Sequence, residues 1–179
     1  MKRRMKKLIS SKSIPILTLV LLAGVVLMTG IVWAKATEYS VNCEFTYGST
    51  SMAKNWTDDE GVQHLRGIVY LLNSDPNSGN IKINIAGVCN HNREMVVTGD
   101  GDFWGHDVAQ VTWGDLTGTF RGIHGGIRVN FTEASSIHVY EGIDGDLVGW
   151  KLRLNGTWNM DPDVKAGTLE GILQNPYGD

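Results

Sequence analysis

The sequence predicts an all-β fold, an antiparallel β-barrel in preference to a β-sandwich, preceded by one membrane-directed helix. Three observations predict it: an uncharged stretch at residues 14–34, apolar residues that recur with a period of two from Val62 onward, and 22 glycines that separate the apolar runs. Beyond Thr37, no window of eleven or more residues carries the 3.6-residue stripe of a helix. The length of 179 residues suits one folded domain.

The first element is the segment at residues 14–34, which follows a basic stretch from Lys2 to Lys12. A signal peptide usually has an apolar region of about 7–15 residues, whereas a spanning helix needs about 20, so the length favours an anchor. The small residues of Ala34-Lys35-Ala36 instead fit a cleavage site, and both interpretations of residues 1–36 stay open. In either case the positive-inside rule places residues 37–179 outside the cytoplasm, at the cell membrane or in the extracellular space.

The following elements are short strands joined by turns. Residues 81–85 and 127–131 alternate apolar and polar side chains, so each is predicted to turn its apolar face toward a core. Glycine pairs such as Gly118 and Gly122 suit tight bends, which favours closure into a barrel. The other predicted strands are residues 41–47, 65–72, 95–98, 108–113, 116–121, 137–140, 148–154 and 168–173. The predicted turns are residues 73–79, 99–102 and 142–146.

Charge and cysteine content limit the partners of the exported part. Seven of the sixteen basic residues precede Thr37, which leaves nine against nineteen acidic residues and a net charge of −10. Such a domain lacks the basic surface that nucleic acid requires. Outside the cytoplasm, Cys43 and Cys89 are predicted to form a disulfide, and two buried thiols are the alternative.

The segment at residues 116–128 carries a family resemblance. Its residues Gly118, Phe120, Gly122 and Gly125 resemble the Gly-x-Phe/Tyr-x-Gly-x-x-Gly segment of the allene oxide cyclase and dirigent-type barrels, and equally an uncharacterised secreted family of similar pattern. The resemblance covers roughly the last hundred residues and implies an eight-stranded barrel whose lumen holds an apolar ligand. It transfers no catalytic residue.

Histidines and acidic turns are the candidates for chemistry. His124 and His138 can converge in a hairpin with Glu141 as a third ligand, and the alternative places His138 on the solvent face of its strand. Two groups of acids also resemble parts of calcium sites but lack the remaining ligands, so ordinary turn chemistry is the preferred explanation. Those acids are Asp100, Asp102 and Asp107, and separately Asp144 and Asp146. We therefore predict no metal and no cofactor, and no catalytic residue can be assigned because no nucleophile motif is present.

These features predict a non-catalytic module that binds a ligand or a surface, and they leave open whether the protein is an enzyme. The alternatives are an isomerase- or cyclase-like enzyme with an apolar lumen and a structural protein of the cell envelope. The expected partners are the membrane, through the amino-terminal segment, and a small apolar ligand or a glycan. The predicted ligand-binding residues are Arg121, His124, Tyr140, Glu141, Phe103 and Trp104.

Overall fold

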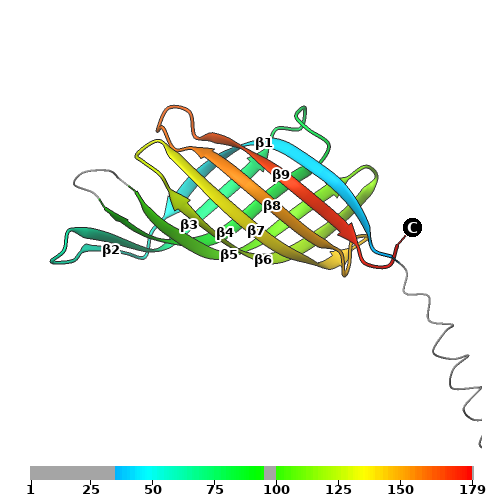
Figure 1. The fold of residues 1–179 in the computed structure, drawn as a ribbon, viewed down its shortest axis with the longest axis horizontal. Helices are drawn as coiled ribbons and strands as arrows, with labels where there is room; N and C mark the ends of the chain where they lie inside the picture. Colours follow the sequence, from blue (N-terminus) through cyan, green and yellow to red (C-terminus); the bar gives the residue numbers. More distant parts are fainter. Residues whose placement is uncertain (1–34, 95–99, 179) are drawn as a thin grey trace, which may run out of the picture. The chain divides into compact units, whose positions relative to one another are not determined.

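The protein folds as an antiparallel sheet of nine strands, seen in a computed structural model that describes residues 35–94 and 100–178 (Figure 1). The strands are β1 (Thr37–Ser51), β2 (Lys54–Thr57), β3 (Val62–Ser74), β4 (Lys82–Glu94), β5 (Gly101–Trp113), β6 (Leu116–Arg128), β7 (Glu133–Gly145), β8 (Lys151–Asn159) and β9 (Ala166–Asn175). This confirms the all-β prediction. The described part of the chain contains no helix, and so none that is long and apolar enough to cross a membrane.

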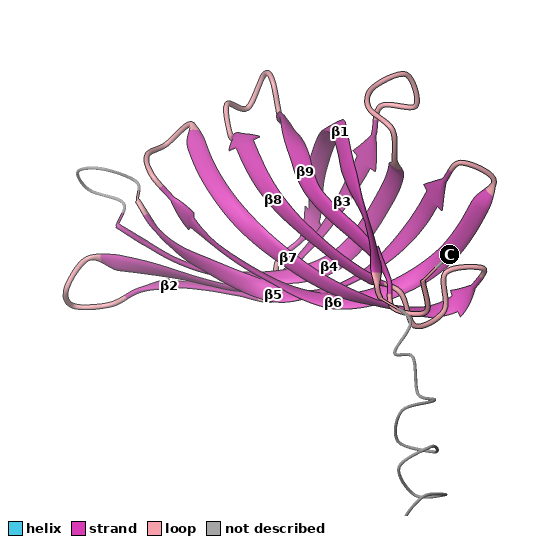
Figure 2. Ribbon diagram, turned by 45° about the vertical axis from the view of Figure 1, so that its right-hand side comes forward, coloured by secondary structure: helices cyan, strands magenta, loops and turns pink. Residues whose placement is uncertain are grey.

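The sheet closes into a ring (Figure 2). Each strand from β3 to β9 pairs with the next one along the chain, and β1 pairs with both β9 and β3. The short strand β2 pairs with β3 and lies outside this closed circuit. Closure leaves no long unpaired edge among the eight ring strands, which is how such sheets avoid edge-to-edge aggregation.

Most predicted strands lie within longer observed ones, but several predicted boundaries are wrong; the strand predicted at residues 148–154, for example, begins only at Lys151. The strand predicted at residues 127–131 ends at Arg128, because the backbone turns there through residues 129–132. The turn predicted at residues 142–146 is instead largely strand, since β7 continues to Gly145. The membrane-directed segment at residues 14–34 and the predicted strand at residues 95–98 lie outside the described residues.

The faces of two strands are the reverse of the prediction. In β6 and the turn after it, Ile127 and Val129 are exposed while Arg128 is only 9% exposed. In β7, Ile137 and Val139 face outward, and His138 is fully buried. Arg128 and His138 therefore face the interior of the ring, where they find hydrogen-bond partners, and the isoleucines and valines beside them face outward.

One end of the ring interior is filled by a hydrophobic core. Its side chains alternate inward along every strand and interdigitate, as burial of apolar surface requires. The rings of Tyr39, Trp113 and Trp150 pack against one another at this end, with centroids 4.4 to 6.0 Å apart, and Tyr39 stacks on Trp150. The most buried core residues are Leu72, Ile83, Ile85, Phe120, Leu152, Leu154, Leu169 and Leu173. The filled end leaves space for a ligand only toward the opposite end.

Candidate functional site

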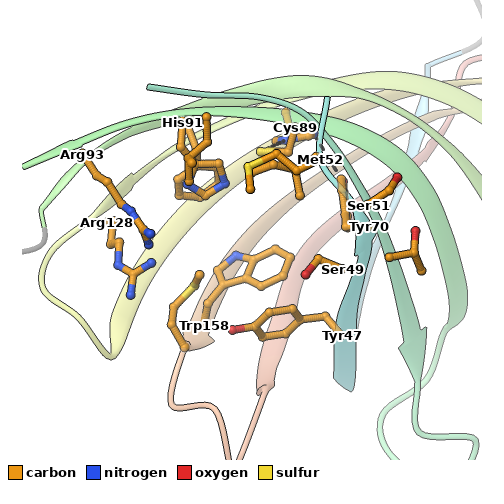
Figure 3. Close-up of a pocket in the computed structure, with 16 residues that line it drawn as sticks. Tyr47, Ser49, Ser51, Met52, Tyr70, Cys89, His91, Arg93, Arg128 and Trp158 are labelled. Carbon is orange, nitrogen blue, oxygen red and sulfur yellow. Dashed lines mark hydrogen bonds between the residues drawn. The ribbon is translucent and has the colours of Figure 1, made fainter. Parts of the chain in front are cut away.

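A cavity of about 500 Å³ lies inside the opposite end of the ring (Figure 3). Its walls are mainly apolar and aromatic, and the described residues that line it include no aspartate or glutamate. The apolar and aromatic lining residues are Tyr47, Met52, Leu65, Ile68, Tyr70, Phe103, Trp158 and Met160. A volume of this size is typical of small-molecule sites.

The polar layer between the cavity and the core is arranged around Asp107, which is 2% exposed. In the ladder, Asp107 of β5 lies opposite Gly87 of β4 and Gly122 of β6. A Cβ atom at Gly87 would come within 2.2 Å of Asp107 Oδ1 and 2.8 Å of the Tyr70 ring. Glycine therefore makes the space that the carboxylate and the tyrosine ring occupy.

Four donors converge on the Asp107 carboxylate. Tyr70 donates its hydroxyl to Oδ1 at 2.5 Å, and Tyr140 donates to Oδ2 at 2.8 Å. His124 Nδ1 lies 2.9 Å from Oδ1, and His138 Nδ1 lies 3.5 Å from Oδ2. Burial tends to raise the pKa of Asp107, but the hydrogen bonds from His124 and His138 hold that pKa well below its usual range. The carboxylate is therefore ionised and accepts all four contacts.

The contact with Asp107 favours one tautomer of His124. In the neutral form of His124, the proton on Nδ1 is donated to the ionised Asp107, which leaves Nε2 as an acceptor. That nitrogen lies 3.3 Å from the Sγ atom of Cys89, which also lines the cavity. A thiol, an imidazole and a carboxylate are thus connected in one line from the cavity into the interior.

A second branch of the network runs through His138 on the far side of Asp107. Trp158 donates its indole N–H to Ser136 Oγ at 2.7 Å, and Ser136 Oγ lies 2.9 Å from His138 Nε2. If Ser136 donates to Nε2, the His138 Nδ1 proton points toward Tyr140 and Asp107. Burial lowers the pKa of His138, which agrees with a neutral ring.

Asp107, His124 and His138 are also the described group that has the composition of a metal site. One carboxylate oxygen and two imidazole nitrogens lie within 4.8 Å of one another, a donor set that suits zinc. Each of these atoms already has a hydrogen-bond partner, and no buried side-chain polar atom of the described residues lacks one. The network is complete with protons alone and does not require an ion.

Two arginines stand beside the cavity, side by side in Figure 3. Arg93 Nε donates to Gln63 Oε1 at 2.8 Å, and Arg128 Nε donates to the carbonyl of Asn130 at 2.9 Å. Within the described residues, neither guanidinium has a carboxylate within 4.0 Å. Burial lowers the pKa of both arginines, and the charge of Arg93 lowers that of Arg128 further. The two guanidinium groups are thus partly buried like charges that no carboxylate of the described side chains pairs with.

Comparisons with known proteins add no relative. No protein-family model, no curated protein and no solved structure matches this chain. The resemblance to the allene oxide cyclase and dirigent-type barrels therefore rests on the glycine and aromatic residues at positions 118–125 alone. The function must be argued from the geometry of the site.

The structure separates the six predicted ligand-binding residues into two groups. His124, Tyr140 and Phe103 face the interior, and His124 and Phe103 line the cavity. The other three lie on the outside of the ring, namely Arg121, Glu141 and Trp104.

The acidic residue beside His124 and His138 is Asp107 and not Glu141, which was predicted as the third ligand. Glu141 pairs with Lys151 at 2.8 Å on the surface, and its side chain is 59% exposed. The placement of His138 on the solvent face was also wrong, because it is fully buried. The calcium grouping of Asp107 with Asp102 fails as well, since Asp102 is exposed and Asp107 is buried.

The predicted disulfide does not form, because Cys43 and Cys89 are both buried free thiols. Cys43 lies on β1 and Cys89 on β4, and β3 pairs with both strands between them. Strands two apart in a sheet are separated by roughly 10 Å, which exceeds the reach of about 7 Å between the Cα atoms of a disulfide.

The sequence contains a signal for this network that the predicted strand faces do not include. Glycines precede polar residues by two positions on the inward face, as in Gly105-His-Asp107 and Gly122-Ile-His124. In the structure, these glycines make room for rings on the neighbouring strands: a Cβ at Gly105 would lie 2.6 Å from His124 Cε1. Other network and cavity residues are absent from the predicted ligand-binding set, namely Tyr70, Ser136, Trp158, His91, Arg93 and Arg128.

The partly buried imidazole of His91, which lines the cavity, predicts a pH dependence of stability. Burial, reinforced by the charge of Arg93, lowers the pKa of His91 from 6.5 to about 4. Between these values the unfolded chain binds a proton that the folded protein does not, so the free energy of unfolding should fall as pH drops from 6.5 to 4. His138, whose pKa is also lowered, acts in the same direction.

Urea denaturation of the wild type and of His91→Gln across this pH range measures the effect. The variant should lose less stability on acidification, because one of the two neutral buried rings has been removed. Equal pH slopes for the two proteins would contradict the assignment.

Proposed function

We propose that the protein is an exported or membrane-anchored binding module whose closed ring serves as a β-barrel that holds a small amphipathic anion. The observation that carries the proposal is the cavity of about 500 Å³ with apolar walls, two arginines and no acid among its described lining residues. A medium-chain carboxylate combines the two properties that this cavity selects, an apolar body and one negative charge.

The apolar part of such a ligand fits against Leu65, Ile68 and Phe103, which lie between the mouth and the polar layer. Transfer of hydrocarbon from water to such walls contributes about 0.8 kcal/mol for each buried CH₂ group. The polar floor is already satisfied by its own hydrogen bonds, so an apolar chain that ends above it leaves no unpaired group there.

The charged end of the ligand fits the guanidinium groups of Arg93 and Arg128. Arginine pairs with a carboxylate through two parallel hydrogen bonds, and this pairing strengthens when water is excluded. An anion also relieves the repulsion between the two cations, which lie close enough for Arg93 to lower the pKa of Arg128. A neutral ligand of the same length gains neither effect and should bind more weakly.

We also propose that the module works outside the cytoplasm. The basic residues that precede the uncharged segment at residues 14–34 support a domain that works outside the cytoplasm. There, the module would take up a free amphipathic anion from the surrounding medium or from the membrane surface.

Titration calorimetry with octanoate tests the proposal, with the full-length protein in lipid nanodiscs and empty nanodiscs as the blank. Arg93→Gln and Arg128→Gln should each weaken binding about 10- to 100-fold, because a hydrogen bond to a charged group contributes about 1.5–3 kcal/mol. Octanol should bind the wild type more weakly than octanoate does.

Arg121→Gln is the matched control, because Arg121 lies on β6 with Arg128 but is exposed on the outside of the ring. Its affinity for octanoate should equal that of the wild type. Failure of the wild type to bind octanoate, or equal weakening in the Arg121 and Arg128 variants, would overturn the proposal and favour a structural role in the envelope.

A further inference from the structure

We infer that Cys89, His124 and Asp107 form a nucleophile, a general base and an orienting carboxylate that take an acyl group from an activated ester in the cavity. This activity goes beyond ligand binding and uses the cavity floor, whereas the proposed anion site uses the arginines near its mouth. It is carried by two distances: 3.3 Å from Cys89 Sγ to His124 Nε2, and 2.9 Å from His124 Nδ1 to Asp107 Oδ1.

The order of the three groups is the one that nucleophilic catalysis requires. A base must lie within hydrogen-bond reach of the nucleophile, and a third group must hold the base in the correct tautomer. Here, Asp107 accepts the Nδ1 proton of His124, so the free electron pair of Nε2 faces the thiol. Cys89 and His124 both line the cavity, so a bound ligand can reach the sulfur.

The imidazole is held firmly in this position. Tyr70 contacts the ring of His124 edge-on with centroids 5.5 Å apart, and the absence of a side chain at Gly105 leaves the space for it. Tyr70 and Tyr140 hold the Asp107 carboxylate from two sides. A preorganised base costs little reorganisation when the reaction begins.

The reaction follows from these positions. The sulfur of Cys89 attacks the ester carbonyl carbon and forms an S–C bond, while the thiol proton moves to His124 Nε2. The resulting imidazolium is stabilised by the Asp107 carboxylate. When the tetrahedral intermediate collapses, the C–O bond to the alcohol breaks and His124 returns the proton to the leaving oxygen. The products are a thioester on Cys89 and a free alcohol, and no oxidant or reductant is needed.

Cys43 provides an internal reference for the reactivity of Cys89. Both thiols are buried, and burial raises their pKa values, to about 11 for Cys43 and about 12 for Cys89. Neither thiol therefore ionises by itself near neutral pH. Within the described residues, no imidazole nitrogen lies within hydrogen-bond distance of Cys43, so base assistance distinguishes Cys89.

The test uses p-nitrophenyl acetate, a neutral activated ester, with the full-length protein in detergent. The wild type should release one equivalent of p-nitrophenol in a fast phase, and peptide mass mapping should place the acetyl group on Cys89 and not on Cys43. Cys89 should react faster in the native protein than in concentrated guanidinium chloride, where a cysteine without a base is more exposed. A slower native reaction, or no acetyl group on Cys89, would overturn the inference.

Two variants separate base assistance from simple access. His124→Gln and Asp107→Asn should slow acetylation of Cys89 at least about 100-fold, the lower range of general-base effects. Alkylation of Cys43 by iodoacetamide reports whether each variant is unfolded. If both variants unfold, the acetylation rates of Cys89 in native and in denatured wild type test the inference instead. Unchanged acetylation in a folded His124→Gln protein would overturn the inference.

Octanoate binding and acetylation are measured on the same preparation, so their failures are distinguishable. Octanoate binding without acetylation of Cys89 would overturn the triad and leave the anion site in place. Acetylation without octanoate binding would overturn the proposed anion site and leave the triad in place.

Discussion

Replacing Asp107 by alanine should lower the free energy of unfolding by about 3–5 kcal/mol, the largest effect that we expect from a single substitution. The carboxylate accepts hydrogen bonds from Tyr70, Tyr140 and His124, and all of these donors are buried. Alanine would leave the donors without a partner and far from water, and each buried unsatisfied group costs about 1–3 kcal/mol. Urea denaturation followed by tryptophan fluorescence measures the loss.

Asp102→Ala is the control for this prediction. Asp102 lies on the same strand as Asp107, but its side chain is exposed. A surface substitution of this kind changes stability by no more than about 0.5 kcal/mol. Similar losses in the two variants would show that the buried carboxylate is not the centre of the network.

Gly122→Ala should destabilise the fold by about 3 kcal/mol, the second large effect. A Cβ atom at this position would lie 2.2 Å from the carbonyl oxygen of Val139 and 2.3 Å from Cδ1 of Tyr140. The variant must therefore shift the β7 backbone and displace the Tyr140 ring, which weakens the hydrogen bond from Tyr140 to Asp107. Overpacking of an interior typically costs about 1–3 kcal/mol, and the damaged hydrogen bond adds to it.

Gly125→Ala on the same strand tests whether steric contact is the cause. A Cβ atom at Gly125 would have one neighbouring atom within 4 Å, the carbonyl oxygen of Phe103 at 3.9 Å. This variant should be as stable as the wild type or slightly more so, since alanine reduces the entropy of the unfolded chain. Thermal unfolding by circular dichroism compares the two variants directly, and equal melting temperatures would refute the steric argument.

Alternation along the chain was a correct guide to strands and, at residues 81–85, also to faces, since Ile81, Ile83 and Ile85 are buried, but it failed for the faces of β7. Ile137 and Val139 alternate with polar residues, so the rule that apolar side chains face inward predicts a buried Ile137 and an exposed His138. The structure has the opposite arrangement, because His138 completes hydrogen bonds inside the ring that it would lack in an apolar core. Where the ring interior is polar, as around Asp107, a polar residue such as His138 faces inward and its apolar neighbours face outward.

The candidate site was visible in the sequence only in part. His124, Tyr140 and Phe103 were predicted to face a lumen, and they do lie in the interior. Their neighbours Arg121 and Glu141 were predicted with them and lie outside, because successive residues of a strand point to opposite faces. The register of β7 decides which of the adjacent residues Tyr140 and Glu141 enters the ring, and the strand pairing sets that register.

The sequence by itself determined the all-β class and most of the strand positions, because these depend on local periodicity and on glycine-rich turns that a short window of residues contains. The convergence of Tyr70, Cys89 and Asp107 with His124 was decided only by the tertiary structure. These residues come from β3, β4, β5 and β6, and they meet because the ladder register aligns each of them with a glycine or a histidine on the next strand. Contacts between residues 17 to 54 positions apart depend on that pairing, which no local pattern encodes.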